Sequence, residues 1–172
     1  MATMPGQLFT EYFLSDGIRA TPEWRESVEQ PQPFADFARA VVNRFNEFGG
    51  YADPNEAVTE QELIRPLLEL LGWHDYLPQQ GAARNEDIPD LLLFAGAEDK
   101  GRAAGRGHSQ ERFRDALLIE ESKRFGLPLD NRDPDDAVQR STPHGQILRY
   151  LATAETVSDG RLRWGVLTNG GV

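Results

Sequence analysis

The 172-residue chain contains no cysteine. This absence excludes disulfide bonds, zinc sites with thiolate ligands and a cysteine nucleophile. The chain also lacks any apolar run approaching the ~18–20 residues that a bilayer-spanning helix requires. Neither the basic segment nor the long apolar segment of a secretory signal peptide occurs in its first residues, MATMPGQLFTEYF. We therefore expect a cytoplasmic protein without a membrane partner.

Positive charge is scarce as well. Lys and Arg number 18 against 28 Asp and Glu, so the formal net charge is −10. Proteins that coat nucleic acid usually have a basic surface, so this class is not indicated. A role on DNA would require local positive contacts, or another domain or subunit that supplies them. Glycine-rich phosphate loops and H-E-x-x-H spacing are also absent, which argues against a nucleotide loop and a histidine metal site.

The chain is predicted to begin with an N-terminal arm over residues 1–30. Its scattered apolar residues indicate a short helix followed by an extended segment packed on the domain. The domain itself is expected to cover residues 31–172. Its first helix is predicted over 34–48, where apolar residues recur at helical spacing until Gly49 and Gly50 end the pattern.

A second helix is predicted from Asp53 to Leu71. Asp53 at the N-cap and Glu56 at the N3 position resemble a capping box. Gly72 follows the last apolar residue, at the place where helices commonly end. Pro66 lies inside the run, and we expect a kink or break near Arg65 because proline cannot continue the hydrogen-bond ladder.

The second half of the chain alternates strands with one helix. Three segments are predicted to be strands: 89–94, 116–123 and 162–168. A helix is predicted to start at Thr142-Pro143, after a polar connection over 124–141. The order α, α, β, β, α, β predicts an α/β fold with a mixed central sheet flanked by helices. Because the sequence stops just after the last predicted strand, we expect a fragment of a longer polypeptide.

Residues 95–114 are rich in glycine, alanine and charge, which predicts a long, exposed and mobile hairpin loop. Lys100, Arg102 and Arg106 lie in this segment. Two interpretations remain open for these cations: a basic finger for DNA, or a solvated run without a specific role.

The chemistry concentrates where the second predicted strand ends in charged residues. Side chains alternate across a strand, so Glu121 and Lys123 are expected to share a face. A buried ion pair costs several kcal/mol in desolvation per ion unless something compensates. Asp90, at the start of the preceding strand, would add a second acid if the two strands pair. A divalent cation resolves the conflict, because two carboxylates, waters and a substrate phosphate form an Mg²⁺ site.

An ordinary salt bridge is the simpler interpretation, since triplets of the form E-x-K occur by chance in most chains. The context favours the catalytic interpretation. A Pro-Asp pair begins the strand upstream, and Gln146 and Tyr150 follow on the next helix, four positions apart and therefore on one face.

This order of motifs resembles the PD-(D/E)xK nuclease superfamily. The chain is most similar to the N-terminal nuclease domains of type I restriction endonuclease subunits and of type IIG-like restriction–modification enzymes. The resemblance rests on TEQELIRPLLELLGW (59–73), IPDLLLF (88–94), LLIEESK (117–123), GQILRY (145–150) and WGVLTNG (164–170). The opening LFTEYFLSDGIRATPEW (8–24) also resembles the start of long phage-defence methyltransferases. The step from Asp90 to Glu121 is longer than the compact hairpins of the superfamily.

The resemblance implies a restriction-endonuclease-like core and assigns roles to the motif residues. Asp90 and Glu121 would be metal ligands for Mg²⁺ or Mn²⁺, and Lys123 would be the catalytic lysine. Gln146 and Tyr150 match the Q-x-x-x-Y element, and would contact the DNA backbone or steady the site.

Two further positions are less determined. The superfamily often adds a glutamate from the early helix, and Glu56 matches best as this additional metal ligand, with Glu62 as its competitor. The capping-box role is the alternative for Glu56. Arg124, directly after Lys123, is expected to meet a DNA phosphate.

These expectations describe a metal-dependent endonuclease of double-stranded DNA in a prokaryotic restriction–modification or phage-defence enzyme. Its partners would be methyltransferase and target-recognition domains of a longer chain, or separate subunits. One alternative is a nuclease-fold module without activity that positions DNA or serves assembly. The other is a protein-interaction domain whose N-terminal arm docks on a partner.

Overall fold

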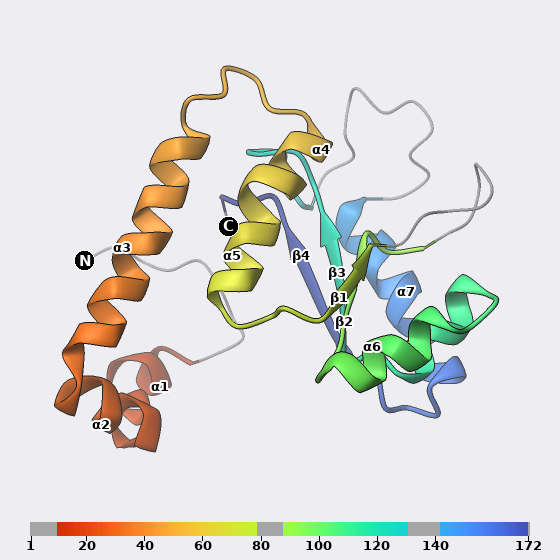
Figure 1. Cartoon of the computed structure of the whole chain (residues 1–172), viewed down its shortest axis with the longest axis horizontal. Coiled ribbons are helices and arrows are strands. Elements are labelled where there is room, and N and C mark those ends of the chain that lie inside the picture. Colours follow the sequence, from red (N-terminus) through yellow and green to blue (C-terminus); the bar gives the residue numbers. More distant parts are fainter. Residues whose placement is uncertain (1–9, 79–87, 131–141, 172) are drawn as a thin grey trace. The chain divides into compact units, whose positions relative to one another are not determined.

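The computed structural model describes residues 10–78, 88–130 and 142–171 (Figure 1). The chain divides into two compact units, Met1–Asn43 and Arg44–Val172. The candidate site lies in the second unit. The two units are described separately below.

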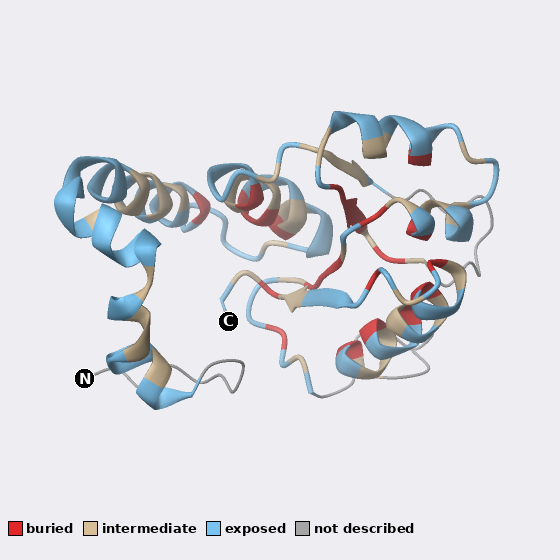
Figure 2. Cartoon of the chain, turned by 90° about the horizontal axis from the view of Figure 1, so that it is seen from below, coloured by how far each residue is buried: buried red, intermediate tan, exposed pale blue. Residues whose placement is uncertain are grey.

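The first unit is helical throughout its described part. It contains α1 (Glu11–Ser15), a 3₁₀ turn η1 (Gly17–Ala20) and α2 (Pro22–Glu29). The predicted short helix is confirmed as α1. The prediction of an extended segment after it is wrong over α2, which is helical. The Thr21 side chain accepts a hydrogen bond from the backbone N–H of Trp24 at 3.2 Å and so caps the start of α2. Pro22 in the first turn also favours a helix at this place. Most residues of these helices are exposed or intermediate (Figure 2).

The predicted helix over 34–48 is confirmed as α3 (Pro31–Phe48), which crosses from the first unit into the second. It begins three residues earlier than predicted, because proline is tolerated in the first helical turn. Phe48, its last residue, is buried.

The second predicted helix is present in three joined parts. These are α4 (Glu56–Thr59), a π-helical turn η2 (Glu60–Ile64) and α5 (Arg65–Leu70). The irregularity expected near Arg65 therefore takes the form of a π turn directly before Pro66, where the proline lacks an N–H to donate.

The predicted cap of this helix was wrong. Asn55, and not Asp53, is the N-cap, because its side-chain oxygen accepts a hydrogen bond from the backbone N–H of Val58 at 2.9 Å. Glu56 is consequently the first residue of α4 and not its N3 residue. The capping-box role of Glu56 is thereby removed.

The sheet contains four strands in the order β1-β2-β3-β4. These are β1 (Tyr76–Pro78), β2 (Leu91–Leu93), β3 (Leu118–Ser122) and β4 (Trp164–Thr168). The first two pairings are antiparallel and the third is parallel. The parallel pair requires a crossover, which α7 (Pro143–Val157) supplies. The predicted α/β architecture with a mixed sheet flanked by helices is confirmed, and β1 is an additional strand that was not predicted.

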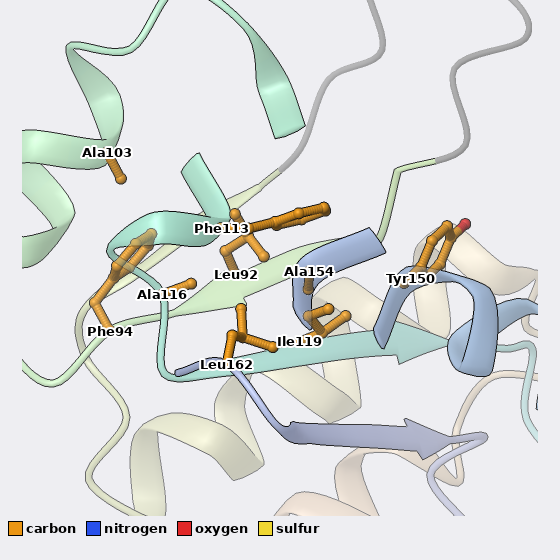
Figure 3. Close-up of a cluster of buried hydrophobic side chains, with 9 residues drawn as sticks. All are labelled: Leu92, Phe94, Ala103, Phe113, Ala116, Ile119, Tyr150, Ala154 and Leu162. Atoms are coloured by element: carbon orange, nitrogen blue, oxygen red, sulfur yellow. The ribbon is translucent and has the colours of Figure 1, made fainter. Parts of the chain in front are cut away.

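Each face of the sheet carries its own apolar cluster, because side chains alternate along the strands. Leu92 and Ile119 face one cluster, which includes Phe113, Tyr150 and Ala154 (Figure 3). The opposite cluster consists of Leu91 and Leu93 with Ile64 and Leu68, and Leu118 packs against it. Helix α7 therefore covers one face, and η2 with α5 covers the other (Figure 1).

The loop predicted over 95–114 was wrong, because the segment folds into α6 (Ala97–Ala104) and a 3₁₀ helix η3 (Ser109–Arg114). Ala103 and Phe113 are buried in the first cluster, so the segment packs back onto the sheet. These two helices occupy the long step between Asp90 and Glu121.

The cations of this segment are paired with acids. Arg102 and Arg106 both form ion pairs with Asp115, and Lys100 lies 3.7 Å from Asp75. Most residues of this segment are exposed, as predicted, but the cations belong to folded helices that make ion pairs and not to a loop. Of the predicted connection over 124–141, residues 131–141 lie outside the described residues. Among the helices described here, none is long and apolar enough to span a membrane.

Gly170, in the turn after β4, tolerates no side chain. Its φ angle is +75°, and an added Cβ would lie 2.5 Å from Cδ2 of the fully buried Leu63. We predict that Gly170→Ala lowers the free energy of unfolding by about 1–3 kcal/mol in urea denaturation. Gly72→Ala is the matched control, because its φ is +88° but no atom lies within 4 Å of its Cβ position. Equal stability of the two variants would contradict the prediction.

Candidate active site

Asp90 and Glu121 come from neighbouring antiparallel strands. Asp90 directly precedes β2, and in the register of the pair Leu91 lies opposite Glu120. Continuing this register by one residue places Asp90 opposite Glu121, and residues directly opposite each other point to the same face. The Asp90 carboxylate is also fixed to β3, since its Oδ2 accepts a hydrogen bond from the backbone N–H of Ser122 at 2.8 Å.

Lys123 follows β3 directly and lies inside the protein. Its backbone N–H donates to the carbonyl oxygen of Thr168 in β4 at 2.8 Å, which holds this end of the strand in place. Its Nζ lies 2.8 Å from Oε1 of Glu121 and 3.6 Å from Oε2 of Glu56. Glu121 is 1% exposed and Lys123 is 6% exposed, so the pair is largely removed from water.

The burial of these acids makes their ionisation costly. Burial raises the pKa of Asp90 to about 6, although the charge of Lys123 and the hydrogen bond from Ser122 oppose the rise. Burial also raises the pKa of Glu121 to about 8, and the charge of Asp90 adds to the rise. Because several carboxyl groups share one ammonium, full ionisation would leave an excess of negative charge in a buried place.

Lys123 keeps its charge in this environment. Burial alone lowers the pKa of its ammonium, but the charges of Glu121 and Glu56 and the hydrogen bond to Glu121 outweigh burial and raise it. The site therefore combines an ammonium with a raised pKa and carboxyl groups whose pKa values are also raised.

Glu120 is a second buried acid that the sequence interpretation did not single out. It lies on the opposite face of β3, where the Ser122 hydroxyl donates to its Oε1 at 2.8 Å. Burial raises the pKa of the Glu120 carboxyl well above its usual range. The position of Glu120 in the middle of a predicted central strand was the sequence signal that could have indicated its burial.

The donors suit a hard divalent cation. In the described part of the chain, the buried Oε2 of Glu121 has no hydrogen-bond partner, and an oxygen of this kind is a suitable metal ligand. Mg²⁺ is commonly bound by one or two carboxylates together with waters and substrate phosphates, so Asp90 and Glu121 fit this ion. No group of three or more Asp, Glu or His side chains within residues 10–78, 88–130 and 142–171 is arranged to hold a metal. The Glu56 carboxylate is directed to Lys123.

The remaining predicted residues lie on different elements. Gln146 and Tyr150 share one side of α7, and Nε2 of Gln146 donates to the Tyr150 hydroxyl at 2.6 Å. The Tyr150 ring is buried in the cluster under α7 (Figure 3). Arg124 is partly buried directly after Lys123. Glu62 is exposed in η2, and it makes no ion pair with a described residue.

The structure thus brings together Asp90, Glu121, Lys123 and Glu56, and leaves Glu62 apart. In comparisons with protein-family models, with curated proteins and with solved structures, nothing matches this chain.

Proposed function

We propose that this chain is a metal-dependent DNA endonuclease domain of a prokaryotic restriction–modification or phage-defence enzyme. The observation that carries the proposal is the pair of acids on adjacent strands, Asp90 and Glu121, with the Lys123 ammonium 2.8 Å from Glu121. The order of three antiparallel strands, a crossover helix and a parallel strand supports a restriction-endonuclease-like core.

The residues of the site would divide the work between them. Asp90 and Glu121 would hold Mg²⁺ or Mn²⁺ through carboxylate oxygens. The bound cation would stabilise charge on the phosphate oxygens and promote formation of the attacking hydroxide. The Lys123 ammonium would orient the attacking water and attract the scissile phosphate. The buried Tyr150 ring would hold α7 against the sheet beside these groups, and Gln146 would fix the Tyr150 hydroxyl.

DNA binding is proposed to depend on more than this chain. With a net charge of −10, the chain repels a phosphate backbone on average, so contacts such as Arg124 to a phosphate would act locally. Methyltransferase and target-recognition domains, or partner subunits, would supply most of the affinity and all of the sequence specificity.

One observation favours a second candidate, a nuclease-fold module without activity that positions DNA or serves assembly. The described residues contain no group of three acids or histidines arranged to hold a metal. A module of this kind would keep the fold and the buried ion pair but would hydrolyse no phosphodiester.

Cleavage of supercoiled plasmid DNA by the full chain distinguishes the two candidates. We expect nicked or linear product with Mg²⁺ or Mn²⁺, and none with EDTA. Asp90→Asn is the control for contaminating nucleases, because it removes a metal ligand while keeping the shape of the side chain. Because this chain alone is expected to bind DNA weakly, the assay is run at low salt and high plasmid concentration. Absence of cleavage there with either metal, or equal cleavage by the variant, would favour the inactive module.

A further inference from the structure

We propose that Glu56 is a positioning residue that holds the Lys123 ammonium, and not a third metal ligand. The inference rests on the proposed nuclease function and assigns a role within the same site. It differs from the expectation that the sequence resemblance gave for Glu56.

The first argument is the direction of the Glu56 side chain. Asn55 caps α4, so Glu56 is the first residue of the helix and not the N3 residue of a capping box. Its Oε2 lies 3.6 Å from Nζ of Lys123. If Glu56 were a third ligand, its carboxylate would lie together with those of Asp90 and Glu121 around one metal position. The described residues contain no group of three such side chains.

The second argument is that α4 and the segment after Lys123 are joined by a partly buried hydrogen bond. The hydroxyl of Thr59, one turn after Glu56, accepts from the backbone N–H of Phe125 at 3.0 Å. The same hydroxyl donates to the carbonyl of Asn55 at 2.9 Å, and Thr59 is completely buried. The distance between Glu56 and Lys123 is therefore set by two linked elements of the fold.

The third argument concerns charge. Lys123 has Glu121 as its nearest partner, and Glu121 is also a proposed metal ligand. A carboxylate that binds a divalent cation attracts an ammonium less strongly, because its charge is already neutralised. Glu56 is 47% exposed on its side chain and is not one of the two proposed metal ligands. It would keep Lys123 in place when Glu121 turns to the metal.

The two roles of Glu56 predict different effects of removing its charge. If Glu56 is a metal ligand, Glu56→Gln weakens metal binding. If it positions Lys123, the variant binds metal as the wild type does but cleaves more slowly at saturating metal.

The test measures Mn²⁺ affinity by electron paramagnetic resonance and single-turnover plasmid cleavage at saturating Mn²⁺, both with the full chain. For Glu56→Gln we expect a Kd for Mn²⁺ unchanged within about twofold and a cleavage rate lowered about 10–100-fold, the size typical of residues that orient a metal site. Glu56→Asp, which keeps the charge, should recover part of the rate. Glu62→Gln is the matched control, since it removes the same charge from an exposed position of the adjoining η2 and should change neither quantity.

Three outcomes would overturn the inference. A Kd for Mn²⁺ raised by about tenfold or more in Glu56→Gln would show that Glu56 contributes to metal binding. A wild-type cleavage rate in that variant would exclude a positioning role. In both cases the wild-type chain still cleaves DNA, and the proposed function stands. A wild-type chain that binds Mn²⁺ but does not cleave, or does neither, removes the proposed function and the inference with it.

Discussion

Replacing Lys123 by alanine is expected to lower the rate of metal-dependent plasmid cleavage by about 10²–10⁴-fold, the range of a positioned proton-transfer or charge-stabilising group. Lys123 is the one cation found within 4 Å of Glu121 among the described residues, and its ammonium remains charged at neutral pH. In the proposed mechanism, the variant would lack the group that orients the attacking water. Single-turnover cleavage at saturating Mn²⁺ measures the effect on this step.

The loss must be separated from an effect on folding. Glu121 can retain a proton when Lys123 is absent, because burial raises its pKa to about 8. We therefore expect Lys123→Ala to stay folded, as circular dichroism would show. Lys100→Ala is the matched control, because Lys100 is an ion-paired lysine of α6. This variant should cleave plasmid DNA at the wild-type rate. Equal rates for the wild type and Lys123→Ala would contradict the assignment.

The stability of the metal-free protein is expected to fall as the pH rises from about 5 to about 8, with a Tm lower by roughly 5–10 °C. Burial raises the pKa of Asp90 to about 6 and that of Glu121 to about 8, from ordinary values of 3.8 and 4.5. The folded state thus binds more protons than the unfolded chain in this window. The free energy of unfolding therefore decreases as the pH passes through the folded-state pKa values, and differential scanning calorimetry measures the change.

The variant Glu121→Gln isolates the contribution of this acid, because its amide does not ionise and the other charges of the chain are unchanged. Its Tm should decline less than that of the wild type over the same pH range. Addition of Mn²⁺ should restore more stability at the higher pH, where the ligands are deprotonated. A Tm that stays constant in the wild type, or declines equally in Glu121→Gln, would contradict the proposed electrostatics.

Hydrophobic periodicity predicted several of the helices and strands. The helix over 34–48, the helix from Thr142-Pro143 and the strand over 162–168 are confirmed as α3, α7 and β4. In α3 and α7 the apolar residues recur at helical spacing, and a proline lies in the first turn of each. The apolar run of β4 ends at Thr168, and Gly170 with a positive φ follows two residues later.

Composition misled the prediction over 95–114. Glycine and charge normally indicate a loop, but Ala103 and Phe113 anchor α6 and η3 to the sheet. Arg102 and Arg106 converge on Asp115, which stabilises this arrangement. These contacts join residues far apart in the sequence, so a local pattern does not reveal them.

The site was predictable to different degrees. Asp90 and Glu121 were expected to share a face if their strands paired, and the register of β2 and β3 supports this. The contact between Glu56 and Lys123 depends on where α4 lies relative to the end of β3. Only the folded chain determines that distance, and the cap at Asn55 in place of Asp53 changed the expected role of Glu56.

The central claim is that the buried carboxylates of Asp90 and Glu121 are held for a divalent cation. Mn²⁺ binding to the full chain at about pH 8, where both groups ionise on metal binding, tests it most directly. We predict that the wild type binds Mn²⁺ and that Asp90→Asn and Glu121→Gln each lose at least roughly tenfold in affinity. A wild-type chain that does not bind Mn²⁺, or variants that bind it equally well, would contradict the account.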